Sequence, residues 1–196
     1  MEHYFSENPK SEHRILNIKY NLEDLELNFT TDTGVFSKNK VDYGTDILIR
    51  TLPSLHGKVL DLGCGYGPIG ISLAKLNPDA QITMVDINQR AVELSNQNIQ
   101  QNNVQNAAVF QSDGFEKVEG LYNAIVSNPP IRAGKKVIYP LFERSIDFLE
   151  EGGALYLVIQ KKQGAKSAMD KLIQIYGNCE VINKKGGYWI LRSIKA

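Results

Sequence analysis

The chain has 196 residues, of which 42% are hydrophobic, and its 22 Lys and Arg balance 22 Asp and Glu to a formal net charge of zero. This length fits one domain with a sizeable core, and no apolar stretch approaches the roughly 18 residues that a membrane span needs. Two cysteines in unrelated contexts, three histidines far from any cysteine pair and a polar N-terminus predict a cytoplasmic protein with no disulfide framework, no metal and no membrane partner.

The first 45 residues predict an extension of that domain. Residues 14–20 and 25–30 have the pattern of a β-hairpin around a polar turn, and apolar and polar residues alternate along the second strand. Residues 45–52 predict a helix. About thirty residues cannot hold a core alone, so we expect residues 1–45 to lie against a core of residues 46–196 within a single domain.

From residue 58 onward, short β-rich runs alternate with helical patterns. Because the strands are almost wholly apolar, they predict a mostly parallel sheet covered by helices on both faces. The predicted fold class is therefore α/β, a Rossmann-like, doubly wound sheet of seven strands whose last strand is antiparallel. The predicted strands are residues 58–62, 81–86, 107–111, 122–127, 153–160, 179–183 and 188–192, and the predicted helices are residues 69–76, 88–102, 137–149 and 164–176.

A glycine-rich turn follows the first of these strands. Asp61 ends the strand, and Gly63, Gly65 and Gly67 alternate before the next helix. In open parallel sheets, ligands bind at the carboxyl ends of the strands, and glycines there permit positive φ angles and close approach of a ligand to the backbone. The next strand ends in Asp86, where a carboxylate can accept both hydroxyls of a ribose. The sequence therefore predicts a nucleoside-containing cofactor at this edge.

The turn alone does not define the type of cofactor. Residues 65–70 also match the G-x-G-x-x-G pattern of dinucleotide sites, and a turn that binds no ligand is a third alternative. Asp61 would repel a pyrophosphate but suit a cationic sulfonium amino acid, and Asp113, after the third strand, could accept the adenine amino group. These two carboxylates favour S-adenosylmethionine over a nicotinamide cofactor. We expect Cys64 to pack inside the turn, whereas Tyr66 either covers the cofactor or faces solvent.

A second motif, Asn128, Pro129 and Pro130, ends the fourth predicted strand. The exocyclic amine of a base delocalises its lone pair and is a poor nucleophile. The amide oxygen of Asn128 and the carbonyl of Pro129 can accept both N–H bonds and aim the lone pair at a methyl group, while the proline rings fix the backbone. We therefore predict that these three residues are catalytic and that Asn128 also contacts the cofactor. A strand-terminating turn is the structural alternative. Asn128→Asp should be milder than Asn128→Ala, because a carboxylate still accepts the bond.

Positive charge gathers in the last third of the chain. Residues 131–196 hold 12 Lys and Arg against 6 Asp and Glu, whereas residues 61–130 hold 3 against 7. Two basic stretches follow strand ends on one edge of the sheet and could track a phosphate backbone, although a solvated lysine-rich surface has the same composition. Ile131 would cover the face of a base in place of an aromatic ring. The predicted substrate-binding residues are Ile131, Arg132, Lys135, Lys136 and Lys161, with Lys162 beside them.

These residues resemble the catalytic domain of small-subunit (16S) ribosomal RNA guanine-N2 methyltransferases and their short single-domain relatives, which are class I S-adenosylmethionine-dependent methyltransferases. The resemblance implies methyl transfer to guanine N2, with ribosomal RNA or the small ribosomal subunit as partner. It also implies that the segment around Phe36 closes over the methyl donor, which gives a cofactor role to Phe36 and Asp42. It covers nearly the whole chain from about Leu25 and rests on residues 34–37, 42–45 and 61–67, Asp86, Asp113 and residues 127–130.

Two departures from the family pattern concern the acceptor. The long enzymes carry a second, degenerate domain that helps to hold RNA, and they have Phe where this chain has Ile131. A homodimer is one replacement for that domain. The alternatives are a protein glutamine N-methyltransferase, which shares Asn-Pro-Pro, an NAD-binding oxidoreductase, and a non-catalytic RNA-binding module that keeps the cofactor fold.

Overall fold

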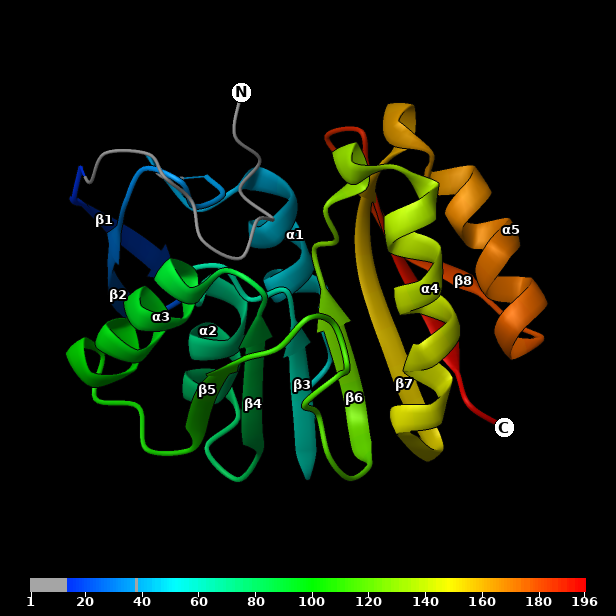
Figure 1. The fold of residues 1–196 in the computed structure, drawn as a ribbon, viewed down its shortest axis with the longest axis horizontal. Helices are drawn as coiled ribbons and strands as arrows, with labels where there is room; N and C mark the ends of the chain where they lie inside the picture. Colours follow the sequence, from blue (N-terminus) through cyan, green and yellow to red (C-terminus); the bar gives the residue numbers. More distant parts are fainter. Residues whose placement is uncertain (1–13, 38) are drawn as a thin grey trace.

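The computed structural model describes residues 14–37 and 39–196, so the polar N-terminal decapeptide, His3 and His13 lie outside the described residues. Figure 1 shows one central sheet flanked by helices, with a small hairpin at one side. The elements in chain order are β1 (Leu16–Leu22), β2 (Leu25–Thr31), α1 (Tyr43–Thr51), β3 (Lys58–Leu62), α2 (Pro68–Leu76), β4 (Gln81–Asp86), α3 (Gln89–Gln101), β5 (Ala107–Gln111), β6 (Tyr122–Ser127), η1 (Ile131–Ala133), α4 (Lys135–Ser145), η2 (Ile146–Phe148), β7 (Leu149–Gln160), η3 (Lys161–Gln163), α5 (Ala165–Tyr176), β8 (Glu180–Lys185) and β9 (Tyr188–Ile194).

The large sheet has seven strands in the order β5-β4-β3-β6-β7-β9-β8. The pairs from β5 to β7 are parallel, and β9 runs antiparallel to both of its neighbours. This confirms the predicted Rossmann-like fold with an antiparallel last strand. The strand order reverses between β3 and β6, so the carboxyl ends of these two strands flank the switch point at which doubly wound sheets bind ligands.

Neighbouring residues of the apolar strands face opposite cores. Val59 belongs to the core beneath α1, α2 and α3, whereas Leu60 belongs to the core beneath α4 and α5. The same alternation recurs in β6, where Ala124 and Ile125 point to different sides. Strands buried on both faces are mostly apolar, which is why the sequence pattern identified them.

Asn98 of α3 and Asn102, the C-cap of this helix, cover the edge of the hairpin. Asn98 accepts the N–H of Thr30 at 2.7 Å and donates to its carbonyl at 2.9 Å, and Asn102 pairs in the same way with Asn28 at 2.9 and 2.7 Å. Residues four apart in a helix rise by about 6 Å, close to the spacing of two residues in a strand. The two amides therefore act as a substitute strand and fix the hairpin to the sheet domain.

Most helices and strands begin and end within two residues of the predicted bounds, and the largest difference lies between α4 and β7. The helix expected over residues 137–149 ends as α4 at Ser145, passes through η2, and gives way to β7 at Leu149. Leu149 fits a helical spacing, but it is buried opposite Tyr122 in the sheet. The boundary expected between residues 45 and 46 lies inside α1. No helix in the described part of the chain is long and apolar enough to cross a membrane.

Candidate active site

A cavity of about 370 Å³ lies at the carboxyl ends of β3, β4 and β6 and after the end of β5. The segment around Phe36 and the start of α4 form further parts of its wall. Asp61, Gly67 and Ile131 do not line the cavity, and neither do the predicted basic residues. The predicted site residues that line it are Phe36, Gly63, Gly65, Asp86, Asp113, Asn128, Pro129 and Pro130.

The three glycines of the turn have different roles. Gly63 and Gly65 have φ of 76° and 59°, and a Cβ added to either would meet no atom within 4 Å. Gly67 has φ of 96°, but a Cβ there would lie 2.8 Å from a side-chain atom of Ile71 and 2.9 Å from one of Met84. The first two glycines therefore leave bare backbone beside the cavity, whereas Gly67 permits tight packing at the start of α2.

Most N–H groups of residues 63–70 are already bonded within the protein. The N–H groups of Gly63 and Cys64 both donate to the carbonyl of Val85 at 2.9 Å, and that of Gly65 donates to Asp86 Oδ2 at 2.8 Å. A dinucleotide turn instead presents its N–H groups to a pyrophosphate. The hydrogen bonding of this turn therefore disfavours the nicotinamide alternative.

Asp86 joins the turn to the next strand. Its Oδ1 accepts the N–H of Asn88 at 2.9 Å, its Oδ2 accepts that of Gly65, and burial raises the pKa of its carboxyl. Each carboxylate oxygen keeps a further lone pair for a hydroxyl donor. Because Asp86 lines the cavity, these lone pairs are available to the two hydroxyls of a ribose.

Asp61 lies beneath the turn and is fully buried. Its Oδ2 accepts the N–H of Gly70 at 2.8 Å, whereas its Oδ1 has no hydrogen-bond partner among the described residues. Burial raises the pKa of this carboxyl to about 7, the Gly70 bond opposes the rise, and the charge of Asp86 adds to it. A buried carboxylate oxygen without a partner is stabilised by a cationic group on the other side of the turn, either directly or through a water that lies between the oxygen and the cation.

Asn128 is held in one orientation by two residues of the α1 region. Its Nδ2 lies 3.2 Å from Asp42 Oδ2 and 2.9 Å from Thr45 Oγ1. An ionised carboxylate only accepts hydrogen bonds, so the nitrogen must face Asp42 and the amide oxygen must face away. No described residue donates to that oxygen, and Asn128 lines the cavity. The oxygen is therefore an acceptor for a ligand.

Thr45 was missed by the sequence reasoning, and Asp42 entered only through the family resemblance. Asp42 Oδ2 also accepts the N–H of Thr45 at 3.1 Å, so Asp42 is the N-cap of α1. An Asp directly before the first residue of a helix is a capping signal that can be recognised in the sequence. Nothing in that signal points to Asn128, which is 86 residues away.

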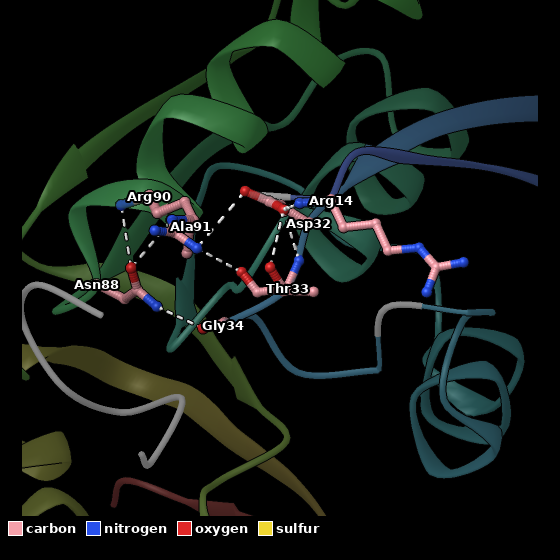
Figure 2. A network of polar contacts seen from close by, with 7 residues as sticks. All are labelled: Arg14, Asp32, Thr33, Gly34, Asn88, Arg90 and Ala91. Carbon is pink, nitrogen blue, oxygen red and sulfur yellow. Dashed lines mark hydrogen bonds and ion pairs between the residues drawn. The ribbon is translucent and has the colours of Figure 1, made fainter. Parts of the chain in front are cut away.

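The segment before Phe36 is fixed to the start of α3. Asn88 caps that helix and donates to the carbonyl of Gly34 at 3.0 Å, while Arg90 donates to the carbonyl of Thr33 at 2.7 Å and lies 3.6 Å from Asp32 (Figure 2). Phe36 follows this clamp, lines the cavity and is 40% exposed. The clamp therefore fixes the position of the segment that forms this side of the cavity.

Tyr66 and Cys64 face the protein interior. Tyr66 is buried, its ring meets that of Phe29 edge-on at 5.7 Å, and it donates to the carbonyl of Ser37 at 3.5 Å. It also lines the cavity, so it does not face solvent. Cys64 is buried against Ser95, and burial raises the pKa of its thiol.

The predicted basic residues are exposed at the carboxyl edge of the sheet. Arg132 lies in η1, Lys135 and Lys136 begin α4, and Lys161 and Lys162 lie in η3 directly after β7. Ile131 is partly buried and packs against the core beneath α4 and α5. Within residues 14–37 and 39–196, no group of three or more His, Cys, Asp or Glu side chains is placed to hold a metal ion.

The strand order, the cavity at the switch point, the bare glycine backbone and the Asn-Pro-Pro end of β6 define a Rossmann-like methyltransferase domain. Residues 26–192 match the family model of the methyltransferase small domain, and the chain belongs to that family. This match, together with the similarity to a solved methyltransferase structure that contains AdoMet, confirms the predicted class, a methyltransferase that uses S-adenosylmethionine.

Three relatives illustrate the match. The chain is 46% identical to the uncharacterized protein YbxB of Bacillus subtilis over 99% of this chain and 98% of that protein. It is 41% identical to ribosomal RNA small subunit methyltransferase C of Aeromonas hydrophila, over 69% of this chain but 40% of that enzyme. The structure of a 16S rRNA N2 methyltransferase of T. thermophilus (RsmC) with AdoMet and guanosine superposes with a TM-score of 0.83 at 25% identity, over 95% of this chain and 51% of that one. This chain therefore spans about half the length of these rRNA methyltransferases, or less.

Proposed function

We propose that this protein transfers a methyl group from S-adenosylmethionine to an exocyclic amine nitrogen, namely guanine N2 in ribosomal RNA. The observation that carries the proposal is the orientation of Asn128, whose amide nitrogen is held by Asp42 and Thr45 so that its oxygen is left as an acceptor beside the cavity. The names of the Aeromonas and T. thermophilus relatives support the choice of ribosomal RNA.

The residues of the cavity fit the methyl donor. Asp86 would accept the ribose hydroxyls, Asp113 is an exposed carboxylate of the cavity wall for the adenine amino group, and Gly63 and Gly65 leave room for close approach. Asp61 would compensate the positive charge of the methionine part from beneath the turn. When bound, the sulfonium supplies an electrophilic methyl group.

Asn128 and Pro129 would hold the acceptor nitrogen. The Pro129 carbonyl already accepts the N–H of Ile131 at 2.8 Å, and it keeps one lone pair for a second donor. Two acceptors on the two N–H bonds turn the nitrogen lone pair away from the ring system and orient it for transfer. The new N–C bond leaves the nitrogen with one proton in excess, which passes to water, so the site needs no strong base.

The chain's charge distribution supports RNA over a protein acceptor. The carboxyl edge of the sheet carries a group of exposed cations. They come from η1 and the start of α4 (Arg132, Lys135 and Lys136) and from η3 (Lys161 and Lys162). Phosphates match such an edge, whereas a glutamine side chain has no charge to match it. The bonded N–H groups of the glycine turn argue against an NAD-binding oxidoreductase.

A methyl-transfer assay tests the proposal. Tritiated S-adenosylmethionine is incubated with the protein and with 30S subunits, free ribosomal RNA or release factors from cells that lack its gene. We expect label in 16S rRNA, recovered as N2-methylguanosine after nuclease digestion, and incorporation slowed about a hundredfold or more with the Asn128→Ala variant. Label in release factors as methylglutamine would favour the protein alternative. Binding of the methyl donor without any transfer would favour the RNA-binding module.

A further inference from the structure

Two tyrosine rings lie together just outside the cavity. Tyr43 is the first residue of α1 and Tyr188 the first of β9, and their ring centroids are 5.9 Å apart at an interplanar angle of 77°. Tyr43 is 44% exposed, and Tyr188 is partly exposed. The exposed ring surface of such a pair can pack against a ligand with a flat apolar surface.

Glycines fix both rings in place. A Cβ added to Gly186 would lie 2.3 Å from Cε1 of Tyr43, and one added to Gly44 would lie 2.7 Å from Cε1 of Tyr188. Each ring therefore packs on the backbone next to the other ring. This interlock joins the start of α1 to the β8–β9 turn, so a ligand that stacks here meets surfaces that are already ordered.

The aromatic pair adjoins the residues that hold Asn128. Asp42 precedes Tyr43 and Thr45 follows Gly44, and both bond to the Asn128 amide. Neither tyrosine lines the cavity itself. A base that occupied the acceptor position would therefore leave its chain neighbours close to Tyr43 and Tyr188 rather than inside the cavity.

Basic residues lie near the Tyr188 side of the pair. Lys161 donates its backbone N–H to the carbonyl of Gly187 at 2.7 Å, which brings η3 against the β8–β9 turn, and Lys185 is exposed at the end of β8. The Tyr188 hydroxyl has its pKa raised by burial and by Asp42 and lowered by Arg132, so both charges lie near this ring. Figure 1 shows the β8–β9 turn at the same end of the molecule as α1 and the start of α4.

We propose that Tyr43 and Tyr188 form a stacking platform for the unpaired nucleotide next to the methylated one, in which one ring stacks on the base, the other ring, nearly perpendicular to it, meets the edge of the base, and the phosphates lie beside Arg132, Lys161 and Lys185. The inference rests on the proposed function and specifies how a single-stranded RNA segment lies on the protein. Aromatic rings with a cationic rim are the features that bind single-stranded RNA, and each stacked base contributes roughly 1–3 kcal/mol. A protein segment would leave the cations of the rim without partners.

The test compares two probes in the presence of saturating S-adenosylmethionine. One is a short fluorescein-labelled single-stranded RNA of mixed sequence, and the other has the same length and backbone but no bases. We expect the wild-type protein to prefer the RNA, and Tyr43→Ala and Tyr188→Ala to weaken RNA binding about 5- to 150-fold while hardly changing binding of the abasic probe. Tyr43→Phe and Tyr188→Phe keep the rings and should stay within about twofold of the wild type.

The pattern across probes separates stacking from other roles. A structural role would weaken both probes equally and lower the affinity for S-adenosylmethionine, measured by calorimetry, which would overturn the platform. Unchanged RNA preference in the alanine variants, in a protein that still methylates RNA, would overturn the platform alone and leave the proposed function intact. A wild-type protein that prefers a glutamine-containing peptide to RNA would overturn both.

Discussion

The Asn128 amide nitrogen lies 3.2 Å from Asp42 Oδ2, a contact between the end of β6 and the N-cap of α1. Asp42→Asn isolates this contact, because asparagine is as good an N-cap as aspartate but no longer forces the Asn128 nitrogen toward it. We expect the rate of methyl transfer to fall by up to about tenfold in single-turnover measurements, because many of the molecules would present the wrong end of the Asn128 amide.

Thr45→Ser, which keeps the second acceptor, is the matched control and should have near-normal activity. The affinity for S-adenosylmethionine should be unchanged in both variants. If Asp42→Asn lost cofactor affinity and kept its transfer rate, Asp42 would act on the cofactor instead of on Asn128.

Substitutions of Asn128 itself should both be severe. Asn128→Ala removes the acceptor, and loss of one positioned group costs on the order of a hundredfold or more in rate. The sequence alone favours Asn128→Asp as the milder change, but the structure reverses this expectation, since a second carboxylate would face Asp42 within hydrogen-bond distance. We expect Asn128→Asp to be as slow as Asn128→Ala near neutral pH and to recover when combined with Asp42→Asn. A single Asn128→Asp variant with near-normal turnover would contradict the orientation argument.

Asp86→Ala should weaken S-adenosylmethionine binding by roughly 1–3 kcal/mol, because it would remove the two hydrogen bonds that we propose to the ribose. The same substitution removes the acceptor of the Gly65 and Asn88 N–H groups, so its effect on thermal stability must be measured beside calorimetric affinity. Asp79→Ala changes an exposed carboxylate and serves as control. An Asp86→Ala protein that binds the methyl donor normally would exclude a ribose role.

Binding of RNA should depend on salt through the basic edge. A variant with alanine in place of five basic residues should show a weaker dependence on salt; the residues are Arg132, Lys135, Lys136, Lys161 and Lys162. The slope of log affinity against log salt should become less negative by about 0.7 for each phosphate of single-stranded RNA that is no longer neutralised. Lys19, Lys58 and Lys75 lie on the hairpin, at the start of β3 and at the end of α2. Their replacement by alanine should leave the slope unchanged. Equal slopes for the two variants would place the RNA elsewhere.

The sequence predicted the fold well because local patterns encode it. The strands β3, β4, β5 and β6 begin and end at the predicted residues, since each has a mostly apolar centre bounded by polar or turn residues. Leu149 was misassigned because one apolar residue fits the end of a helix and the start of a strand equally well, and only pairing with Tyr122 decides.

The candidate site was predictable only in part. Gly63, Gly65, Asp86 and Asn128 follow strand ends, where topology alone brings them to one edge. Contacts between distant segments leave no local signal, so neither the Asn128–Thr45 bond nor the packing of Tyr43 on Gly186 could be predicted. The position of Asp61 beneath the turn, outside the cavity wall, depends on the direction of its side chain, which alternation along β3 decides.

Asp61 should make the stability of the protein without bound cofactor depend on pH. Burial raises the pKa of its carboxyl to about 7 in the folded protein, whereas an unfolded chain has the ordinary value of about 3.9. Between these values the folded state holds a proton that the unfolded state has released. The free energy of unfolding should therefore fall as pH rises, by up to about 1.4 kcal/mol per pH unit from this group.

Burial also raises the pKa of Asp86, so the wild type must be compared with an Asp61→Asn variant, in which Asp86 still titrates. This variant keeps an acceptor for the Gly70 N–H, and the difference between the two proteins therefore isolates Asp61. Urea unfolding of both proteins from about pH 4 to about pH 8 should show the wild type losing stability relative to Asp61→Asn up to about pH 7, with a constant difference above it. Saturating S-adenosylmethionine should reduce this loss, since a cation above the turn favours the ionised carboxylate. A difference between the two proteins that is the same at every pH would mean that Asp61 is ionised throughout.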